Sequence, residues 1–364
     1  MLASGKRNNS NELSDIYTLE LEDREKIKNL DNLNNAIAHI PAKHSKNGMK
    51  WTSLFIEQSL YEALDEAKQA VGLKRLGALA EVDVGIVTGR NSFFILNEDT
   101  KNELGASEYT IPIIGKTSVL RSCLFNETDF NTYKKQPSYL LNLNNIMLDS
   151  APKTIQEYLK IGEIEGIHEA YKCRIRKRWF DIPSIYTPDV FLFRQIHHYP
   201  LLVKNNTRAT STDTIHRVRV KNGVDIEKLV SVFFNSLTLV CAEVFGRSYG
   251  GGVLELEPSE AEDLLIPYDE GIKIDIEKID SLLRNNHSTE ALDYVDNIVL
   301  KNHFGFDSFT IAKIRKAWEQ LRDRRNKRHE KPVIDPSLSA QFIMEKKVKY
   351  KAPGLKKKDK TSTN

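Results

Sequence analysis

The 364-residue sequence contains only three cysteines, Cys123, Cys173 and Cys241, and they lie far apart along the chain. Disulfide frameworks and zinc sites bring cysteines together in pairs or at ligand spacing, so the sequence predicts neither a disulfide framework nor a metal site. Long apolar runs are also missing. The longest, residues 229–242, is too short to span a bilayer. The first seven residues lack the apolar core of a signal peptide, and a cytoplasmic location is therefore expected.

Composition and patterning predict an α+β protein. Apolar residues make up 40% and charged residues 28% of the chain, which excludes disorder throughout. Residues 81–265 contain short β-prone stretches separated by glycines, and residues 225–245 have the spacing of one long helix. Residues 266–331 are helical in pattern. The fold class expected is thus a mixed, short-stranded β domain followed by a helical segment.

The flanking segments differ from this central part. Residues 1–16 are polar and are expected to be flexible, and residues 332–364 form a basic tail in which three prolines oppose regular structure. Between residues 17 and 80 we expect a strand at 17–22 and helices at 31–40 and 53–71. Nothing in these residues looks like a self-sufficient domain.

Positive charge is concentrated, although the net charge is only +3. Residues 171–221 contain eleven Lys and Arg against three Asp, residues 313–331 nine against three acids, and residues 341–364 eight against two. The remainder of the chain is correspondingly acidic. Clustered basic charge predicts a polyanionic partner. The alternative is that these are solvated helix faces and a solvated tail.

The densest basic stretch is residues 171–180, with five cations and three aromatic residues. Read as a strand, it would place Arg174, Arg176 and Arg178 on one face, where they could follow phosphates or read guanine edges. The alternative is a solvated edge strand whose charge deters aggregation. Downstream, Asn205 has the side chain suited to adenine contact, although a plain turn is the commoner role of such a residue. The candidate DNA-binding side chains are Lys172, Arg174, Arg176, Lys177, Arg178, Trp179, Arg194, Lys204, Asn205, Arg208, His216, Arg217 and Arg219.

Several segments together resemble one family. Residues 82–94, Val-Asp-Val-Gly-Ile-Val-Thr-Gly-Arg-Asn-Ser-Phe-Phe, resemble the entry into the target-recognition region of adenine-N6 DNA methyltransferases of type II restriction–modification systems. Residues 50–55 resemble the stretch that joins the family's catalytic domain to that region. Further matching segments occur in the family's order, and the resemblance covers roughly residues 50–265. It implies a DNA target-recognition domain at residues 81–265.

The chain departs from the family in its catalytic parts. Family members hold the target adenine with a tetrapeptide that contains two adjacent prolines, and none of the twelve prolines here has a proline neighbour. Only some fifty residues precede the match, too few for a sheet that binds S-adenosylmethionine. The resemblance therefore implies a recognition half with no catalytic residues, metal or cofactor of its own. S-adenosylmethionine is expected on a catalytic methyltransferase partner, and double-stranded DNA is the second partner.

The resemblance also suggests where that partner would dock. In family members the segment equivalent to residues 17–80 continues out of the catalytic domain. Trp51, Leu54 and Phe55 are apolar residues in it with no obvious place in a recognition module, so they are the docking candidates.

Two other classes remain open. A restriction endonuclease needs carboxylates and a lysine around Mg²⁺, and Asp275-Ile276-Glu277-Lys278 is the nearest candidate, without the usual Glu-x-Lys spacing. The other alternative is a stand-alone DNA-binding remnant with no methyltransferase partner.

A first prediction concerns the cofactor. We expect the chain alone neither to bind S-adenosylmethionine nor to transfer methyl groups, because the tetrapeptide and the cofactor loop are missing from its sequence. Calorimetric titration with the cofactor and a tritiated-methyl transfer assay measure both properties. Micromolar binding of the cofactor to the chain alone would contradict the prediction.

Overall fold

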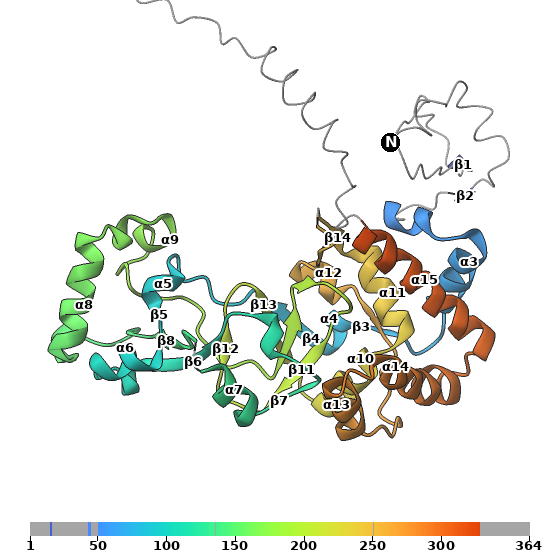
Figure 1. Ribbon diagram of the computed structural model, residues 1–364. Helices are drawn as coiled ribbons and strands as arrows, with labels where there is room; N and C mark the ends of the chain where they lie inside the picture. Colours follow the sequence, from blue (N-terminus) through green and yellow to red (C-terminus); the bar gives the residue numbers. More distant parts are fainter. Residues whose placement is uncertain (1–14, 17–42, 45–49, 135, 250, 328–364) are drawn as a thin grey trace, which may run out of the picture.

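A computed structural model describes residues 15–16, 43–44, 50–134, 136–249 and 251–327 (Figure 1). Two separate apolar cores divide this part of the chain into two lobes. The small lobe consists of residues 86–113 and 138–182, and the large lobe of the residues before, between and after them. Figure 1 shows the lobes side by side, so that the molecule is elongated, with α8 at one end and α15 at the other.

A five-stranded sheet forms the centre of the large lobe, in the order β4-β13-β9-β11-β7. Its strands are β4 (Ala80–Asp83), β13 (Ile215–Val220), β9 (Val190–Phe193), β11 (Leu202–Asn205) and β7 (Leu124–Phe125). Neighbours run antiparallel except β11 and β7, which are parallel. β9, in the middle, is almost continuously apolar and buried, as expected for a strand covered on both faces.

The helices of the large lobe pack around α11 (Ser236–Phe245), in which nearly every side chain is buried. It lies against α15 (Ser308–Lys327), which in turn packs on α3 (Gln58–Ala67). α3 is amphipathic and buries Leu60, Leu64 and Ala67. Residues from near the two ends of the described chain therefore complete one core.

The long helix expected at residues 225–245 is two helices, α10 (Ile226–Phe233) and α11, bent by 75°. The cause is Asn235, whose side-chain oxygen accepts the backbone N–H of Thr238 and whose amide donates to the carbonyl of Val232, so that it caps the second helix. Among the described residues no single helix is long and apolar enough to cross a membrane. This bent pair passes that test only when its two members are taken together.

The small lobe has a four-stranded sheet in the order β12-β6-β8-β5. The strands are β12 (Thr210–Ser211), β6 (Thr110–Ile114), β8 (Tyr139–Leu141) and β5 (Ile95–Leu96), and the helices are α5 (Asn91–Phe94), α6 (Glu98–Glu103), α8 (Lys153–Ile164) and α9 (Tyr171–Arg174). β12 comes from the large-lobe part of the sequence. The sheet therefore bridges the two lobes.

The remaining elements are short. Further helices are α4 (Leu76–Leu79), α7 (Glu127–Tyr133), α12 (Pro258–Glu262), α13 (Ile276–Arg284) and α14 (Ser288–Asp296), which continues into the π-helix η6 (Asn297–His303). Single 3₁₀ turns are η1 (Trp51–Phe55), η2 (Ser107–Tyr109), η3 (Thr117–Val119), η4 (Leu148–Ser150) and η5 (Ile167–Glu169). Small sheets pair β1 (Asp15–Ile16) with β2 (Lys43–His44), β3 (Lys74–Arg75) with β16 (Leu265–Ile266), and β15 (Leu254–Glu255) with both β10 (Gln195–Ile196) and β14 (Arg247–Ser248).

The α+β fold class predicted from the sequence is confirmed. The strand expected at residues 171–180 is wrong: the structure has the short helix α9 followed by turns, and the alternation of arginines there reflects no sheet. The elements expected at residues 17–22 and 31–40, and the tail from residue 332, lie outside the described residues.

The lobes meet where the chain leaves β4. Gly85 lies so close to the segment between β12 and β13 that a Cβ atom on it would stand 1.9 Å from the carbonyl oxygen of Thr212. One residue later, the N–H of Ile86 donates to the carbonyl of Ser211 at 2.7 Å. Only glycine permits this approach of two backbones.

We therefore expect Gly85→Ala to lower the free energy of unfolding by about 3 kcal/mol, the upper end of what overpacking costs, since backbone atoms cannot move aside as a side chain can. Chemical denaturation measures the change. Gly115→Ala is the matched control: its Cβ would meet Thr212 at an ordinary 3.6 Å. Equal effects of the two substitutions would contradict the close contact at Gly85.

Candidate nucleic-acid interface

Arg217, one of the candidate DNA-binding side chains, lies in the interior. It is 2% exposed, and its guanidinium donates to the carbonyl of Val84 at 2.9 and 3.2 Å and to the carbonyl of Ser184 at 2.5 Å. Val84 is on the connection into the small lobe, and Ser184 is on the connection back to β9. Arg217 therefore fastens both connections to β13, and in this arrangement it cannot reach DNA.

Tyr186 completes this cluster. Two guanidinium groups lie against its ring, with centroid distances of 4.1 Å to Arg217 and 4.6 Å to Arg219. Its hydroxyl donates to Asp83 at 2.7 Å. Burial, and next the hydrogen bond to Asp83, raise the pKa of the Tyr186 hydroxyl, which therefore stays protonated. Asp83 therefore contacts the hydroxyl of Tyr186, and the guanidinium of Arg217 contacts the ring of the same tyrosine rather than the carboxylate itself.

Two more of the candidate DNA-binding side chains have internal roles. His216 is fully buried and donates from Nε2 to the carbonyl of Leu256 at 2.7 Å; burial lowers the pKa of its imidazole, so that it is neutral at pH 7. The amide of Asn205 donates to the carbonyls of Pro188 and Ala209, and its oxygen accepts from Thr207. Asn205 closes a turn, which is the commoner role noted for it.

Several other candidate DNA-binding side chains are held by carboxylates. Arg194 lies 3.0 Å from Glu255 and 2.9 Å from Glu257, and Lys204 lies 2.7 Å from Glu227. Arg219 pairs with Glu81 at 3.1 Å, at the surface, and Arg178 forms a two-pronged pair with Asp181. Trp179 packs with Phe93, Phe94 and Phe180, and so belongs to the core of the small lobe.

The cations that stay available cluster on the small lobe. We use "basic ridge" for Arg90, Lys172, Arg174, Arg176 and Lys177. All but the half-buried Arg176 are exposed, and none of the five has a carboxylate within ion-pair distance in the described part of the chain. Arg90 was not among the candidates from the sequence. The sequence feature that could have pointed to Arg90 is the preceding Gly89, because it lies in the segment that carries the family resemblance.

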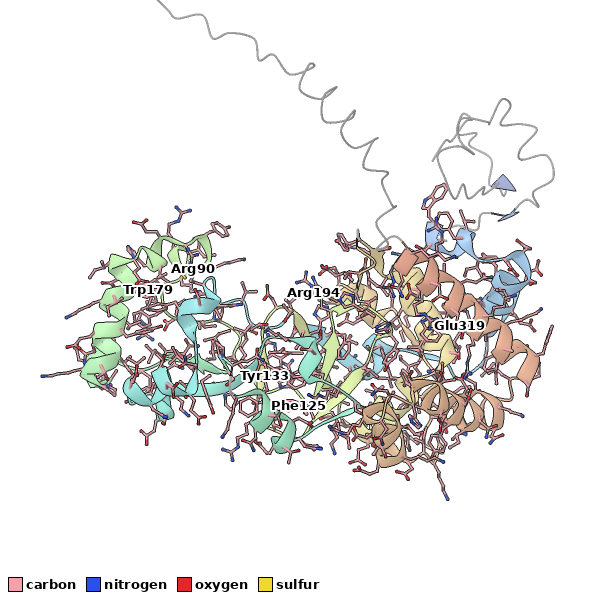
Figure 2. All side chains as sticks on the ribbon, viewed as in Figure 1. Arg90, Phe125, Tyr133, Trp179, Arg194 and Glu319 are labelled. Carbon is pink, nitrogen blue, oxygen red and sulfur yellow. The ribbon has the colours of Figure 1, made fainter. Side chains whose placement is uncertain are left out.

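Close packing brings the two parts of the ridge together. A Cβ on Gly89 would lie 3.0 Å from the Cβ of Lys172 and 3.1 Å from the sulfur of Cys173, so the loop at residues 87–90 lies directly on α9. Arg176 fixes the same loop by donating to the carbonyl of Val87 at 2.9 Å. Figure 2 shows Arg90 in the upper part of the small lobe. Tyr171 and Ile175 are 64% and 59% exposed beside these cations.

Arg208, the last of the candidates, is exposed. Its carbonyl accepts the hydroxyl of Thr187, which places it beside the connection returning to β9. It is not part of the basic ridge as defined.

The docking candidates have different positions. Trp51 is 56% exposed, whereas Leu54 is 2% exposed and Phe55 packs against the large core with the guanidinium of Arg324 3.6 Å above its ring. The expectation that all three lack a place in this module is wrong for Leu54 and Phe55, because α11 and α15 supply that place. Only Trp51 keeps a surface for a partner.

The endonuclease candidate is a helix cap. The carboxylate of Asp275 accepts the N–H groups of Glu277 and Lys278 at the start of α13, and the ammonium of Lys278 lies 4.2 Å from the ring of Tyr294. Within the described residues no group of three or more His, Cys, Asp or Glu could hold a metal ion.

The sequence also contains a motif that is typical of serine hydrolases. Residues 246–250 read Gly-Arg-Ser-Tyr-Gly, the pattern of a serine-hydrolase nucleophile turn. Such a turn leads from a strand into a helix, whereas here the order is reversed: α11 ends at Phe245 and Ser248 lies in β14. The pattern therefore does not form that turn.

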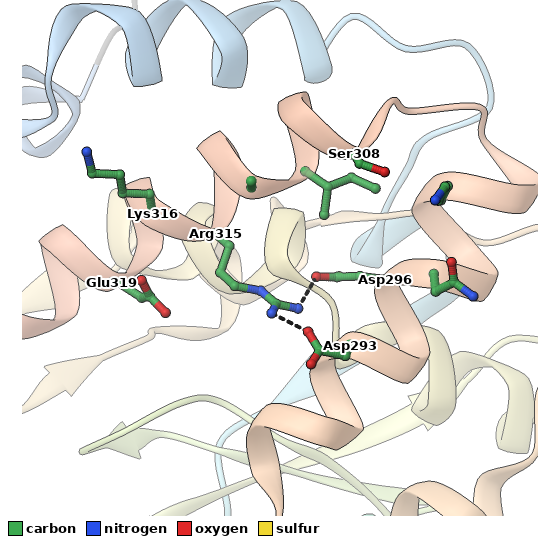
Figure 3. Close-up of a pocket in the computed structure, with 10 residues that line it drawn as sticks. Asp293, Asp296, Ser308, Arg315, Lys316 and Glu319 are labelled. Carbon is green, nitrogen blue, oxygen red and sulfur yellow. Dashed lines mark hydrogen bonds and ion pairs between the residues drawn. The ribbon is translucent and has the colours of Figure 1, made fainter.

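The large lobe has a cavity of about 310 Å³ along α15 (Figure 3). Figure 3 shows the guanidinium of Arg315 pointing to Asp293 and Asp296. Asp296 lies 2.8 Å from Arg315 and also accepts the backbone N–H of Ser236, so these charges join α15 to α14 and α11. The lining contains three acidic and three basic side chains, so the cavity is polar without favouring a ligand of either sign.

Comparison with known proteins assigns the chain to a family. Residues 48–300, more than half of the chain, match the family described as "Type II methyltransferase M.Eco57I, C-terminal domain". The chain belongs to this family. The basic ridge and the Arg217 cluster lie inside the matched residues of this methyltransferase C-terminal domain.

The match is to one part of larger proteins. The solved structure of the type IIG restriction endonuclease BpuSI is similar to 84% of this chain and 38% of that one, with 14% sequence identity and a TM-score of 0.48. The chain thus spans well under half of that protein. No curated protein sequence matches it.

The Arg217 cluster generates a prediction. Arg217→Met keeps most of the side-chain volume but leaves the carbonyls of Val84 and Ser184 without donors, so we expect a loss of about 3 kcal/mol in the free energy of unfolding. Arg219→Met, which removes a surface pair, is expected to cost about 1 kcal/mol or less. Urea denaturation gives both values. Hydrogen exchange near residues 84 and 184 should quicken only in the Arg217 variant, and equal losses would contradict the clamp.

Proposed function

We propose that the chain is the DNA-recognition part of an adenine-N6 DNA methyltransferase of a restriction–modification system. The observation that carries this proposal is the basic ridge, five cations with no carboxylate partner in the described residues, in a chain that belongs to the M.Eco57I C-terminal family. A solvated lysine-rich face would not need Gly89 and Arg176 to hold two separate loops together. The ridge is built at one place by packing.

The division of labour behind this proposal is physical. Methylating an adenine in a duplex requires turning the base out of the stack, at a cost of a few kcal/mol. A recognition part holds the duplex by its phosphates and reads the sequence, while another part receives the base. In this proposal S-adenosylmethionine and the catalytic residues belong to that other part, whether it is on a separate chain or a continuation of this one.

Base reading is proposed for side chains that reach the surface. Arg90 and Arg174 are exposed and carry the two-pronged donor that suits guanine, and Arg208 offers the same group beside Thr187. Arg217, His216 and Asn205 support the backbone that presents these groups. Trp51 is the candidate contact with the catalytic part.

The ridge can be tested through the salt dependence of binding. We expect Lys172→Ala to weaken binding to every duplex about equally, and to make the log–log salt slope shallower by about one unit, because one phosphate contact is lost. Fluorescence anisotropy of a labelled random-sequence duplex, titrated at several salt concentrations, measures both effects.

Lys273→Ala is the matched control, since Lys273 is an exposed lysine of the large lobe outside the ridge. If Lys172→Ala left the affinity and the slope unchanged, the ridge would not be the duplex-facing surface. If the unaltered chain failed to bind duplex DNA at low salt, the proposed function itself would be wrong.

A further inference from the structure

A cavity of about 400 Å³ opens in the small lobe between the loop at residues 144–145 and the turns at residues 176–183. This volume is within the range of small-molecule sites. Its lining includes Arg176 and Lys177 of the basic ridge, and Asn144 and Asn145 of the loop. We use "Asn145 pocket" for this cavity.

The walls of the Asn145 pocket are held by side chains. The amide of Asn144 donates to the carbonyl of Ile182 at 2.6 Å, and its oxygen accepts the N–H of Ile182 at 3.0 Å. Arg178 donates to the carbonyls of Leu143 and Ile146 and grips both oxygens of Asp181. Two side chains thus join segments that are far apart in the sequence, and the shape exists before any ligand arrives.

Most of the polar side chains that line the pocket can donate hydrogen bonds. The only carboxylate in its lining, Asp181, is neutralised by Arg178. Lys177 is exposed without a carboxylate partner among the described residues, and Arg176 uses single N–H groups on the carbonyls of Val87 and Trp179 while the rest of its guanidinium stays available. Burial lowers the pKa of Arg176, so its positive charge is partly desolvated there and a bound anion would compensate it.

Backbone geometry marks the same place. Asn145 has a φ of 61°, in the left-handed region, and its side chain is exposed at the pocket. Ser184, one residue beyond the pocket wall at Pro183, has a φ of 58°. Two non-glycine residues in this region flank one cavity, and such strained residues gather at binding sites.

We propose that the Asn145 pocket binds one phosphodiester group of the bound duplex, with Arg176 and Lys177 as charged donors and the Asn145 amide as a neutral donor. This inference rests on the proposed function, because it takes the phosphate from DNA. The pocket adjoins Ser184, which Arg217 fastens to the large sheet. A phosphate held here fixes the position of both lobes on the duplex, which is what phosphate contacts do in recognition.

The test combines protein and DNA substitutions in the full chain. Lys177→Ala removes a free ammonium, and Asn145→Gly removes the amide while keeping a residue that accepts a positive φ. Neither group makes a structural hydrogen bond among the described residues, so both variants should fold, and unchanged melting temperatures check this. Each is expected to bind duplex DNA about three- to tenfold more weakly than the unaltered chain.

A methylphosphonate scan then locates the phosphate. Neutral methylphosphonates are placed one at a time along a duplex that the chain binds. At one position the substitution should weaken the unaltered chain about tenfold and leave Lys177→Ala with no further loss. Lys172→Ala, which alters the ridge outside the pocket, should lose affinity additively at that same position.

The outcomes separate the two proposals. The chain could bind DNA while both pocket variants bind it with the same affinity as the unaltered chain. Alternatively, the affinity losses from Lys177→Ala and from the methylphosphonate could add at every position. In either case the pocket assignment is wrong and the proposed function stands. If calorimetry shows inorganic phosphate binding micromolar to the unaltered chain and not to Lys177→Ala, without effect of either variant on DNA binding, the pocket serves free phosphate instead. If the unaltered chain binds no DNA, both proposals fail.

Discussion

The guanidinium of Arg217 joins the central sheet to both connections that enter and leave the small lobe near residues 84 and 184. It is buried, and it meets carbonyl oxygens and the face of Tyr186 rather than a carboxylate directly. A charge held in this way has few other arrangements open to it, because any movement of either connection would leave donors and acceptors unpaired in the interior. Gly85 adds a backbone contact that tolerates no side chain. Together they define the relative position of the lobes.

This constraint explains the division among the basic residues. Several arginines in the described part of the chain join structural elements through carboxylates or carbonyls, among them Arg178, Arg194, Arg217, Arg284, Arg315 and Arg325. The planar fork of arginine suits that role, since one side chain can join several acceptors at fixed angles. The ridge, by contrast, combines two exposed lysines with the exposed Arg90 and Arg174 and the half-buried Arg176. The basic clusters seen in the sequence therefore contain two kinds of residue: cations that hold the fold together and cations that are available to a partner.

The sequence was informative where a local pattern decides the structure. Periodicity predicts the α+β class, the amphipathic segment around Leu60 and Leu64, and the buried apolar residues near Val240. The resemblance identified the family. The break at Asn235 was visible only as a polar residue in an apolar run. The site was predicted less well. No sequence feature near Arg217 predicts that residues 184–186 pack against it. The alternating arginines at residues 174–178 suggested a strand, whereas the structure has the end of α9 and turns there. These outcomes depend on contacts between distant segments, which periodicity does not encode.

The small lobe is assembled from two stretches of chain, residues 86–113 and 138–182, and its sheet is completed by β12 from a third. A single exchange of continuous sequence therefore cannot replace this lobe without also replacing residues 114–137, which belong to the large lobe. A recombinant that swapped only residues 138–182 would pair a foreign β8 with the resident β5 and β6, and would face the resident Gly89 loop with a foreign α9. New sequence preferences are reached more readily by point changes at exposed positions such as Arg90 and Arg174, which leave the three-stretch assembly intact.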